Sequence, residues 1–325
     1  MHALDEEGAL SVVREHSYRT ILLEVPEGVR DRAAVLADRI RQETRCVAIV
    51  WGGTCWGPCD LHEHEAAPLV DAVLHFGHTP LPGGERPVPV HFLSIEYEGG
   101  LPNDLVADLR ERLGDRPAAL ISTVQYLPLL PRLREALDDV VIPQGALAPG
   151  QVSGCDQSAA VAAPEDRVLV YLGTGRFHPL GAALATGRPV LVLDLELGMV
   201  EEVGRKEAER FQRKRFAAIA RALDARKWGV YISTKSGQGR RDRAIGLLEA
   251  VEGAGREAIL IAMDDVSPAA LLPFHLEALV SCACPRVAVD DGMNYPFPVL
   301  TPDEAEIALG LRTYDDWTPP FRGPG

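Results

Sequence analysis

The chain has 325 residues, of which 46% are hydrophobic and 25% are charged, a composition typical of globular proteins and unlike that of disordered chains. Its 47 acidic and 33 basic side chains give a net charge of −14, which argues against direct nucleic-acid binding because phosphates require a basic surface. No apolar run approaches the ~18–20 residues of a membrane-spanning helix, and the acidic N-terminus lacks the features of a secretory signal. We therefore expect a cytoplasmic protein without membrane contact.

Short β-branched runs alternate with helical stretches along the chain, a pattern that predicts parallel sheets with crossover helices. Three groups of strands are expected, at 20–25, 46–51, 72–76 and 88–93, then at 118–122, 139–143, 167–172 and 189–195, and finally at 228–233, 258–263, 278–283 and 286–290. Helical periodicity marks 30–43, 105–113 and 204–223.

The order of these elements repeats about every 100 residues, a workable domain size. The sequence therefore predicts an α/β fold of three related domains with mostly parallel four-stranded sheets, divided as 1–104, 105–204 and 205–325. Each domain has a cysteine in a Gly- or Pro-rich turn after a strand. Because ligands of open α/β sheets bind beyond the carboxyl ends of the strands, we expect thiols at comparable strand ends to converge on one central site.

The cysteines are the residues of this sequence that indicate its chemistry most directly. There are six of them: Cys46, Cys55, Cys59, Cys155, Cys282 and Cys284. In a reducing compartment, disulfides are a poor explanation for these cysteines. They are either buried inert thiols or thiols that take part in metal ligation or redox chemistry. Their spacing does not match a zinc ribbon, whereas soft thiolates suit iron–sulfur clusters. Cys59 and Cys155 each precede a predicted helix, whose N-terminus favours the thiolate. Spacing alone leaves the cluster and the inert thiols as open alternatives.

Several motifs in a fixed order resemble the archaeal type of 2-(3-amino-3-carboxypropyl)histidine synthase, the first enzyme of diphthamide biosynthesis. The resemblance rests on WGPCD (56–60), VLHFGHTPL (73–81), GQVSGCD (150–156), YLGTGRFHPLG (171–181), STKSGQ (233–238) and CPRVAVDD (284–291). It implies one cysteine per domain on a [4Fe–4S] cluster, which would be Cys59, Cys155 and Cys284. Trp56 and Pro58 depart from the Tyr and Ala of the family motif, which alters the shape beside the first ligand. Cys46 opens an apolar strand and is expected in the core.

The resemblance implies a radical S-adenosylmethionine-dependent transferase of a non-canonical kind. Such an enzyme moves the 3-amino-3-carboxypropyl group of S-adenosylmethionine to carbon 2 of a histidine in translation elongation factor 2, and it acts as a homodimer. The task of the protein is then to place one C–S bond of S-adenosylmethionine, so no catalytic side chain beyond the cluster ligands is expected.

Glycine-rich strand ends allow close approach of the backbone to a ligand, and they mark the expected S-adenosylmethionine site. The candidates are Gly173, Thr174, Gly175, Arg176, His178, Gly237, Gln238 and Asp290. Arg176 suits a carboxylate, although an ion pair between domains is an equal alternative. Gln238 would hydrogen-bond the ribose or the amino acid part, and Asp290 or Asp291 would bind near the sulfonium or cap a turn.

The histidines and the basic stretch of the sequence are expected to have mainly structural roles. HEHE (62–65) is expected to form a solvated face, while His78 and His178 lie in matched motifs and either line the site or play a structural role. Residues 201–243 are rich in Lys and Arg, which favours an exposed helix with i,i+4 pairs such as Glu202–Lys206 and Glu209–Arg213 over a docking face for an acidic partner. The alternative functions are a three-cysteine [4Fe–4S] dehydratase or condensing enzyme similar to quinolinate synthase, and a non-catalytic partner subunit that reduces a cluster.

Overall fold

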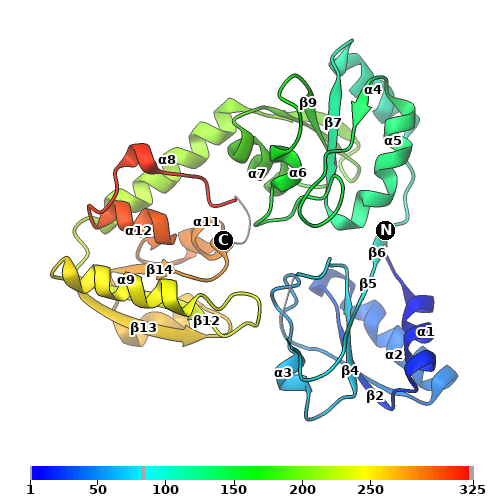
Figure 1. Cartoon of the computed structure of the whole chain (residues 1–325), viewed down its shortest axis with the longest axis horizontal. Helices are drawn as coiled ribbons and strands as arrows, with labels where there is room; N and C mark the ends of the chain where they lie inside the picture. Colours follow the sequence, from blue (N-terminus) through cyan, green and yellow to red (C-terminus); the bar gives the residue numbers. More distant parts are fainter. Residues whose placement is uncertain (1, 82–84, 322–325) are drawn as a thin grey trace. The chain divides into compact units, whose positions relative to one another are not determined.

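Three mostly parallel sheets organise the computed structural model, which describes residues 2–81 and 85–321 (Figure 1). The first sheet contains β2 (Thr20–Glu24), β3 (Val47–Val50), β4 (Ala72–Phe76) and β5 (Val90–Leu93). The second contains β7 (Ala118–Ser122), β8 (Val140–Val141), β9 (Val168–Gly173), β10 (Val190–Asp194) and β11 (Met199–Val203). The third contains β12 (Lys227–Ser233), β13 (Glu257–Met263), β14 (Ala278–Ser281) and β15 (Val299–Leu300).

All three sheets share one strand order. The second strand in the chain lies at the edge beside the first, and the third and fourth strands follow on the other side of the first. The second sheet differs from the predicted four strands because β11 adds a fifth strand at its edge. β1 (His2–Leu4) and β6 (Ile95–Tyr97) form a separate antiparallel pair that the sequence pattern did not indicate. The repeat predicted from element order is therefore a repeat of topology.

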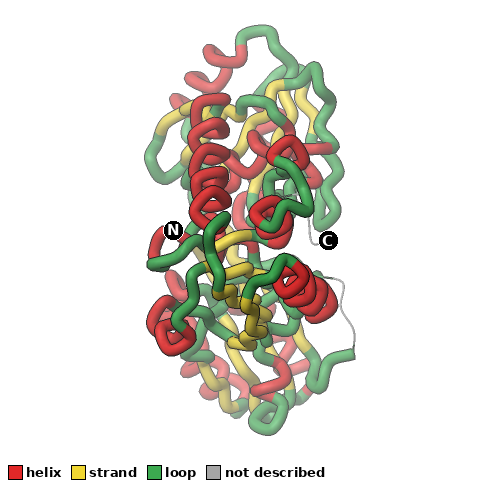
Figure 2. The backbone as a smooth tube through the Cα atoms, turned by 90° about the vertical axis from the view of Figure 1, so that its left-hand side faces the viewer, coloured by secondary structure: helices red, strands yellow, loops and turns green. Residues whose placement is uncertain are grey.

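Helices connect the strands, so that helix and strand alternate along most of the chain (Figure 2). They are α1 (Glu6–His16), α2 (Arg30–Thr44), α3 (Glu63–Ala66), α4 (Asn103–Leu113), α5 (Leu130–Ala136), α6 (Ser158–Val161), α7 (Phe177–Thr186), α8 (Arg205–Ala222), α9 (Arg241–Gly253), α10 (Pro268–Leu271), α11 (Pro285–Val289) and α12 (Pro302–Ala308). Within the described residues, no helix has the length and apolar character needed to span a membrane.

Each sheet has its own apolar core. In the first, α1 and α2 pack Leu10, Leu36 and Ile40 against the buried side chains of β2 and β4. In the second, α4 and α5 cover the central strands in the same way. The third sheet is covered on both faces, by α8, α9 and α12 on one and by the region of α10 and α11 on the other. Burial on this scale explains why strands such as Ala118–Ser122 are apolar throughout.

One predicted strand is wrong. Residues 286–290 lie in α11 and the residue that follows it, and the fourth strand of the third sheet is β15 instead. Pro285 begins α11, and its fixed φ suits the first turn of a helix. The β-branched Val287 and Val289 indicate a strand locally, but the packing of α11 against β14 and β15 decides for a helix.

Contacts between Cα atoms divide the chain into two compact units, called here unit 1 and unit 2. Unit 1 comprises residues 1–152, 162–175 and 191–201, and unit 2 comprises residues 153–161, 176–190 and 202–325. The first sheet belongs to unit 1 and the third to unit 2. The division into three domains at residues 104 and 204 stays a prediction.

Candidate functional site

The six cysteines fall into two groups by exposure. Cys59, Cys155 and Cys284 are half-buried, whereas Cys46, Cys55 and Cys282 are buried, and none of the six is in a disulfide. Cys46 belongs to the core beside α2 and β2, as predicted. Burial raises the pKa of the thiols of Cys46 and Cys282 to about 11, so both stay protonated at neutral pH. The three cysteines that match the family motifs are the three that an added group can reach.

The three motif cysteines follow different strands of their sheets. Cys59 lies in the loop between β3 and α3, and Cys155 lies between β8 and α6, so both follow the second strand in chain order. Cys284 follows the third strand, β14, and is the N-cap residue of α11. All three cysteines therefore follow the carboxyl end of a strand, as expected, although Cys284 follows the third strand of its sheet rather than the second. Their convergence on one site stays a prediction.

The predicted effect of a helix dipole on the thiols of Cys59 and Cys155 has no support, because the helices that follow them are short. α3 and α6 have four residues each, and they begin at Glu63 and Ser158, after the cysteines rather than at them. A single helical turn carries little of the aligned dipole that lowers a thiol pKa. At Cys284, burial is the main effect and raises the pKa of the thiol.

Within unit 2, Cys155 and Cys284 come together although they are far apart in the chain. Cys155 is close enough to contribute, after burial, to the raised pKa of Cys284. The Oε1 atom of Gln238 accepts a hydrogen bond of 3.3 Å from the backbone N–H of Cys284. Gln238 lies in the turn that follows β12, together with Gly237, and its own N–H donates to the Lys235 carbonyl at 3.0 Å. Gln238, predicted to bind S-adenosylmethionine, is thus hydrogen-bonded to Cys284, predicted to bind the cluster.

Two buried polar atoms next to Cys155 lack a hydrogen-bond partner among the described residues. They are Oδ2 of Asp156 and Oε1 of Gln157, both on residues that are almost completely buried. Buried polar atoms are nearly always paired. Both of these are oxygens that accept hydrogen bonds, so they call for a donor such as water.

An arginine links the Cys155 segment to α11. The guanidinium of Arg286 stacks on Phe177 with its central carbon 4.3 Å from the ring centroid, and it lies against Gly154, whose added Cβ would be 3.6 Å from Arg286 Cδ. Arg286 also donates to Oδ2 of Asp290 at 2.6 Å. The predicted binding residue Asp290 therefore has its carboxylate engaged in an ion pair on its own helix.

Two further predicted binding residues, His178 and Arg176, belong to unit 2. Burial, followed by the charge of Arg286, lowers the pKa of His178 to about 4, which keeps the imidazole neutral at physiological pH. Arg176 forms an exposed ion pair with Glu207 at 3.2 Å. Both alternatives stated for Arg176 therefore stay open, because an exposed pair of this kind is weak enough to exchange for a ligand carboxylate.

The predicted glycine-rich turn at 173–175 is part of unit 1. The N–H of Gly175 donates to Oδ2 of Asp194 at 3.1 Å, and Thr174 Oγ1 lies 3.3 Å from the hydroxyl of Tyr126. Gly175 has φ +71°, a left-handed conformation that favours glycine, and open space around its missing side chain. The turn thus leaves an accessible backbone after β9.

A buried network around Glu24 was missed by the sequence reasoning, although an acidic residue at the end of an apolar strand is a readable signal. Glu24 Oε1 accepts from the N–H of His62 at 2.8 Å and pairs with Nδ1 of His62 at 3.0 Å, while Oε2 pairs with Nδ1 of His75 at 2.8 Å. Burial opposes ionisation of Glu24, but these bonds outweigh it and hold its pKa below the usual range. The solvated face predicted for 62–65 is wrong for His62 and Glu63, which are buried.

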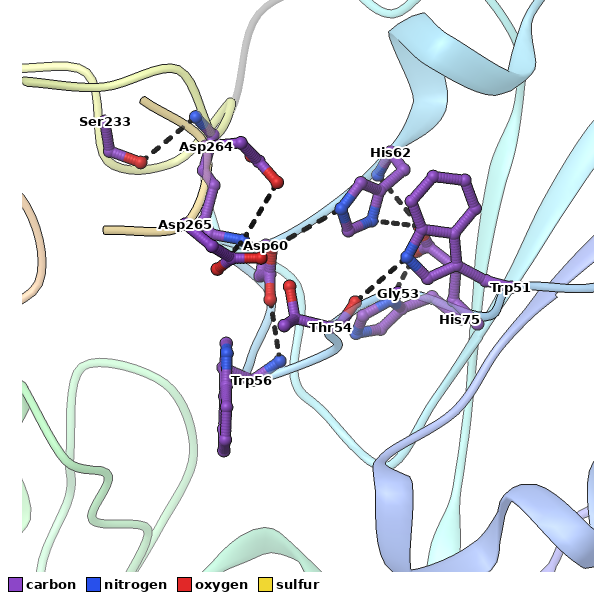
Figure 3. A network of polar contacts seen from close by, with 12 residues as sticks. Trp51, Gly53, Thr54, Trp56, Asp60, His62, His75, Ser233, Asp264 and Asp265 are labelled. Atoms are coloured by element: carbon purple, nitrogen blue, oxygen red, sulfur yellow. Dashed lines mark hydrogen bonds and ion pairs between the residues drawn. The ribbon is translucent and has the colours of Figure 1, made fainter. Parts of the chain in front are cut away.

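The loop that carries Cys59 is ordered by polar contacts of its own (Figure 3). Trp51 donates its indole N–H to the Thr54 carbonyl at 3.1 Å and packs on the His62 ring at 4.1 Å between centroids. The backbone N–H of Trp56 donates to Oδ2 of Asp60 at 2.9 Å. In unit 2, Figure 3 also shows Ser233, Asp264 and Asp265, the surroundings of the buried Lys235, whose Nζ lies 3.1 Å from Asp265 Oδ1.

Comparison with known proteins confirms the resemblance. The family model for diphthamide synthesis proteins matches residues 25–319. The chain is similar to the 2-(3-amino-3-carboxypropyl)histidine synthase of Pyrococcus horikoshii, with 34% identity over 100% of this chain and 95% of that protein. Identity to the protein of the same name from Methanocaldococcus jannaschii is 27%, over 89% of this chain and 84% of the relative.

A solved structure supports the same relationship. The crystal structure of Dph2 from Pyrococcus horikoshii with a 4Fe–4S cluster matches with a TM-score of 0.86 and 34% identity, covering 100% of this chain and 96% of that one. This similarity confirms the predicted α/β fold class.

Proposed function

This chain belongs to the diphthamide synthesis protein family, and on that premise we propose that it is a 2-(3-amino-3-carboxypropyl)histidine synthase. The observation that carries the proposal is that the segment of the half-buried Cys155 packs on α11, where Gly154 lies against Arg286, while α11 begins after the half-buried Cys284 at the Gln238 turn. Full-length similarity to a synthase and to a cluster-containing structure supports the same assignment. The predicted homodimer and the predicted cytosolic location stay predictions.

Cys59, Cys155 and Cys284 are the residues that we expect to hold a [4Fe–4S] cluster. Thiolates are the protein ligands of such clusters, and these three are the accessible thiols of the chain. When bound, the cluster supplies the single electron that the cleavage of S-adenosylmethionine requires.

We expect the side chains of this protein to orient S-adenosylmethionine. We expect the backbone at Gly173–Gly175 and the turn at Gly237 and Gln238 to approach S-adenosylmethionine, since both follow strand ends and contain glycine, which allows close approach. Neutral His178 offers a hydrogen bond without a charge, which suits a site beside a sulfonium cation. Arg176 becomes available to the carboxylate of the methionine part if its exposed pair with Glu207 opens.

The overall transfer balances simply. The bond between the sulfonium sulfur and the γ-carbon of the methionine part breaks, and methylthioadenosine leaves with the sulfur. A bond forms between that carbon and carbon 2 of the imidazole of a histidine. The hydrogen on carbon 2 leaves as a proton and the electron supplied at cleavage is given back, so the transfer is redox-neutral overall. The proposed protein substrate is translation elongation factor 2. Placement of the reacting carbon decides which of three C–S bonds breaks.

The deciding experiment is an anaerobic reaction of the iron-loaded protein with dithionite, S-adenosylmethionine and elongation factor 2. We expect release of methylthioadenosine together with a mass increase on one histidine of the factor. The Cys155→Ser variant should lose both products, whereas Cys282→Ser, which changes a buried thiol, should retain them. Release of 5′-deoxyadenosine, or of no nucleoside product, would contradict the proposal. A dehydratase or an electron-supplying subunit would give no methylthioadenosine.

A further inference from the structure

Three side chains of metal-ligand type gather in unit 1, apart from the motif cysteines. Cys55, His75 and His78 each offer one ligand atom, and these three atoms lie within 4.8 Å of one another. Cys55 lies in the loop after β3, His75 is on β4, and His78 follows that strand. In the described part of the chain, no other group of three or more such residues meets this distance.

The backbone after β4 brings the two histidines together. Gly77 has φ +81°, and a Cβ at this position would lie 2.7 Å from Ile95 Cδ1, so a side chain is strained there on both counts. The resulting turn places Nδ1 of His78 at 2.8 Å from Nε2 of His75. The two rings have a centroid separation of 5.0 Å. The local sequence therefore enforces the pairing of two imidazoles.

The carboxylate of Glu24 orients the first imidazole. Its Oε2 lies 2.8 Å from Nδ1 of His75, and as a carboxylate it accepts, so the proton of neutral His75 belongs on Nδ1. Nε2 then presents its lone pair toward His78. A carboxylate behind a histidine in this way is the usual second layer of histidine metal sites. Glu24 and His75 are both completely buried, which makes this orientation rigid.

We propose that Cys55, His75 and His78 bind a divalent cation of the zinc class, at a site separate from the proposed iron–sulfur cluster. One thiolate and two imidazoles are a donor set that suits zinc and cobalt and disfavours magnesium and calcium. At Zn–S distances of about 2.3 Å and Zn–N distances of about 2.0 Å, tetrahedral ligand atoms lie roughly 3.3–3.6 Å apart. Small side-chain rotations reach that spacing from the observed one.

The protons balance on binding. The Cys55 thiol gives its proton to solvent and becomes the thiolate ligand. If His78 binds through Nδ1, its proton moves to Nε2, so the ring stays neutral. One proton is released per ion bound.

The position of the site gives it a structural consequence for the loop that carries Cys59. Cys55 precedes Cys59 in the same loop, whereas both histidines belong to the end of β4. An ion held by all three ties this loop to the sheet. It would restrict the movement of Cys59 in the cluster-free protein and would leave the chemistry of the cluster itself unchanged.

Cobalt provides the direct test, because a cobalt–thiolate bond gives a charge-transfer absorption that the protein otherwise lacks. The test protein is the full chain with Cys59, Cys155 and Cys284 all replaced by serine, so that no cluster absorbs. We expect binding of about one Co²⁺ per chain with the thiolate band, release of about one proton, and displacement of cobalt by Zn²⁺.

Single changes in this background identify the ligands. Cys55→Ser should abolish the thiolate band, and His78→Gln should weaken cobalt binding at least about tenfold, as expected for loss of a ligand. Cys282→Ser is the matched control, since it also removes a buried thiol, and it should leave the band intact. Absence of cobalt binding by the folded protein, or a thiolate band that survives Cys55→Ser, would overturn the proposal.

A second measurement uses the wild-type chain with its iron in place. After incubation with Zn²⁺ and dialysis, the wild type should retain about one zinc per chain. Cys55→Ser should lose that zinc and keep its iron. Equal zinc contents in the two proteins, or no retained zinc in either, would contradict the site even if the serine variants of the cluster ligands do not fold.

Discussion

At the scale of single residues, exposure gives the six thiols different expected roles. We predict that Cys59→Ala, Cys155→Ala and Cys284→Ala each reduce the iron and sulfide content of the anaerobically purified protein to background, because each removes a half-buried ligand. Cys46→Ala removes a buried thiol of the first core and should leave the iron content unchanged. Full iron content in any of the first three variants would remove that cysteine from the ligand set.

Glu24 is the residue whose loss we expect to cost most stability in unit 1. Its carboxylate is completely buried and is bonded to His62 and His75, so Glu24→Gln should lower the free energy of unfolding by about 2–4 kcal/mol. Urea unfolding at neutral pH measures this change. Glu65→Gln alters an exposed carboxylate of α3 and should change stability by less than about 0.5 kcal/mol. Similar effects of both substitutions would contradict the importance of the network.

The lowered pKa of His178 should make the stability of the folded protein depend on pH. Its pKa is lowered to about 4 in the folded protein, whereas an unfolded histidine titrates near pH 6.5. Between these values the unfolded chain binds a proton that the folded chain does not, so stability is full above about pH 6.5 and falls toward pH 4. The fall from this group is at most about 1.4 kcal/mol per pH unit.

Substitution isolates the contribution of His178 to that fall. The pH profile of urea unfolding should be shallower between pH 6.5 and 4 in His178→Gln than in the wild type, because the variant lacks the titrating group. His64→Gln, which alters an exposed histidine, should leave the profile unchanged. A wild-type slope in His178→Gln would show that the ring does not stay neutral in the folded protein.

At the scale of elements, α8 positions α11 and hence Cys284. Arg215 on α8 is buried and donates to both carboxylate oxygens of Glu304 on α12, to the Ala288 carbonyl on α11 and to the Val299 carbonyl on β15. One side chain therefore joins α8, α11, α12 and β15. Its ion pair is structural, and the basic stretch at 201–243 is accordingly not all surface. On the exposed side, Glu209 pairs with Arg205 rather than with the predicted Arg213.

Removal of Arg215 should therefore be costly. Arg215→Met leaves Glu304 buried without its partner, and we expect a loss of about 3–5 kcal/mol in the free energy of unfolding. Chemical denaturation measures it, and iron content should fall as α11 loosens. Arg205→Met, on the same helix, breaks an exposed pair and should cost less than about 1 kcal/mol. Equal losses would contradict the structural role of the buried pair.

At the scale of the whole molecule, the two compact units have separate apolar cores. The cores of the first two sheets lie in unit 1, and the two cores of the third sheet lie in unit 2. We expect the units to unfold separately, since each has apolar cores of its own. Hydrogen exchange in increasing urea should give different midpoints for peptides from β2 and β4 and for peptides from β12 and β14. Coincident midpoints would indicate a single cooperative unit.

The alternation of strands and helices, the repeat of α/β units and the set of motif cysteines could all be predicted from the amino-acid sequence. Apolar runs such as Ala118–Ser122 and helical periodicity such as that of 30–43 are local patterns, and they predict local structure because burial imposes them. The motif order also identified the family, since several separate matches in sequence restrict the possibilities more than any one of them.

Three outcomes required the packing of distant segments: 286–290 is mainly helical, His62 is buried on Glu24, and the Cys155 segment lies against α11, where Cys284 bonds to Gln238. The same is true of the position of Cys55 against His75 and His78. Each of these outcomes depends on side chains that are distant in the chain, and pairing of that kind follows from how helices pack on sheets. Periodicity records which face of an element is buried, but it does not record which partner that face meets.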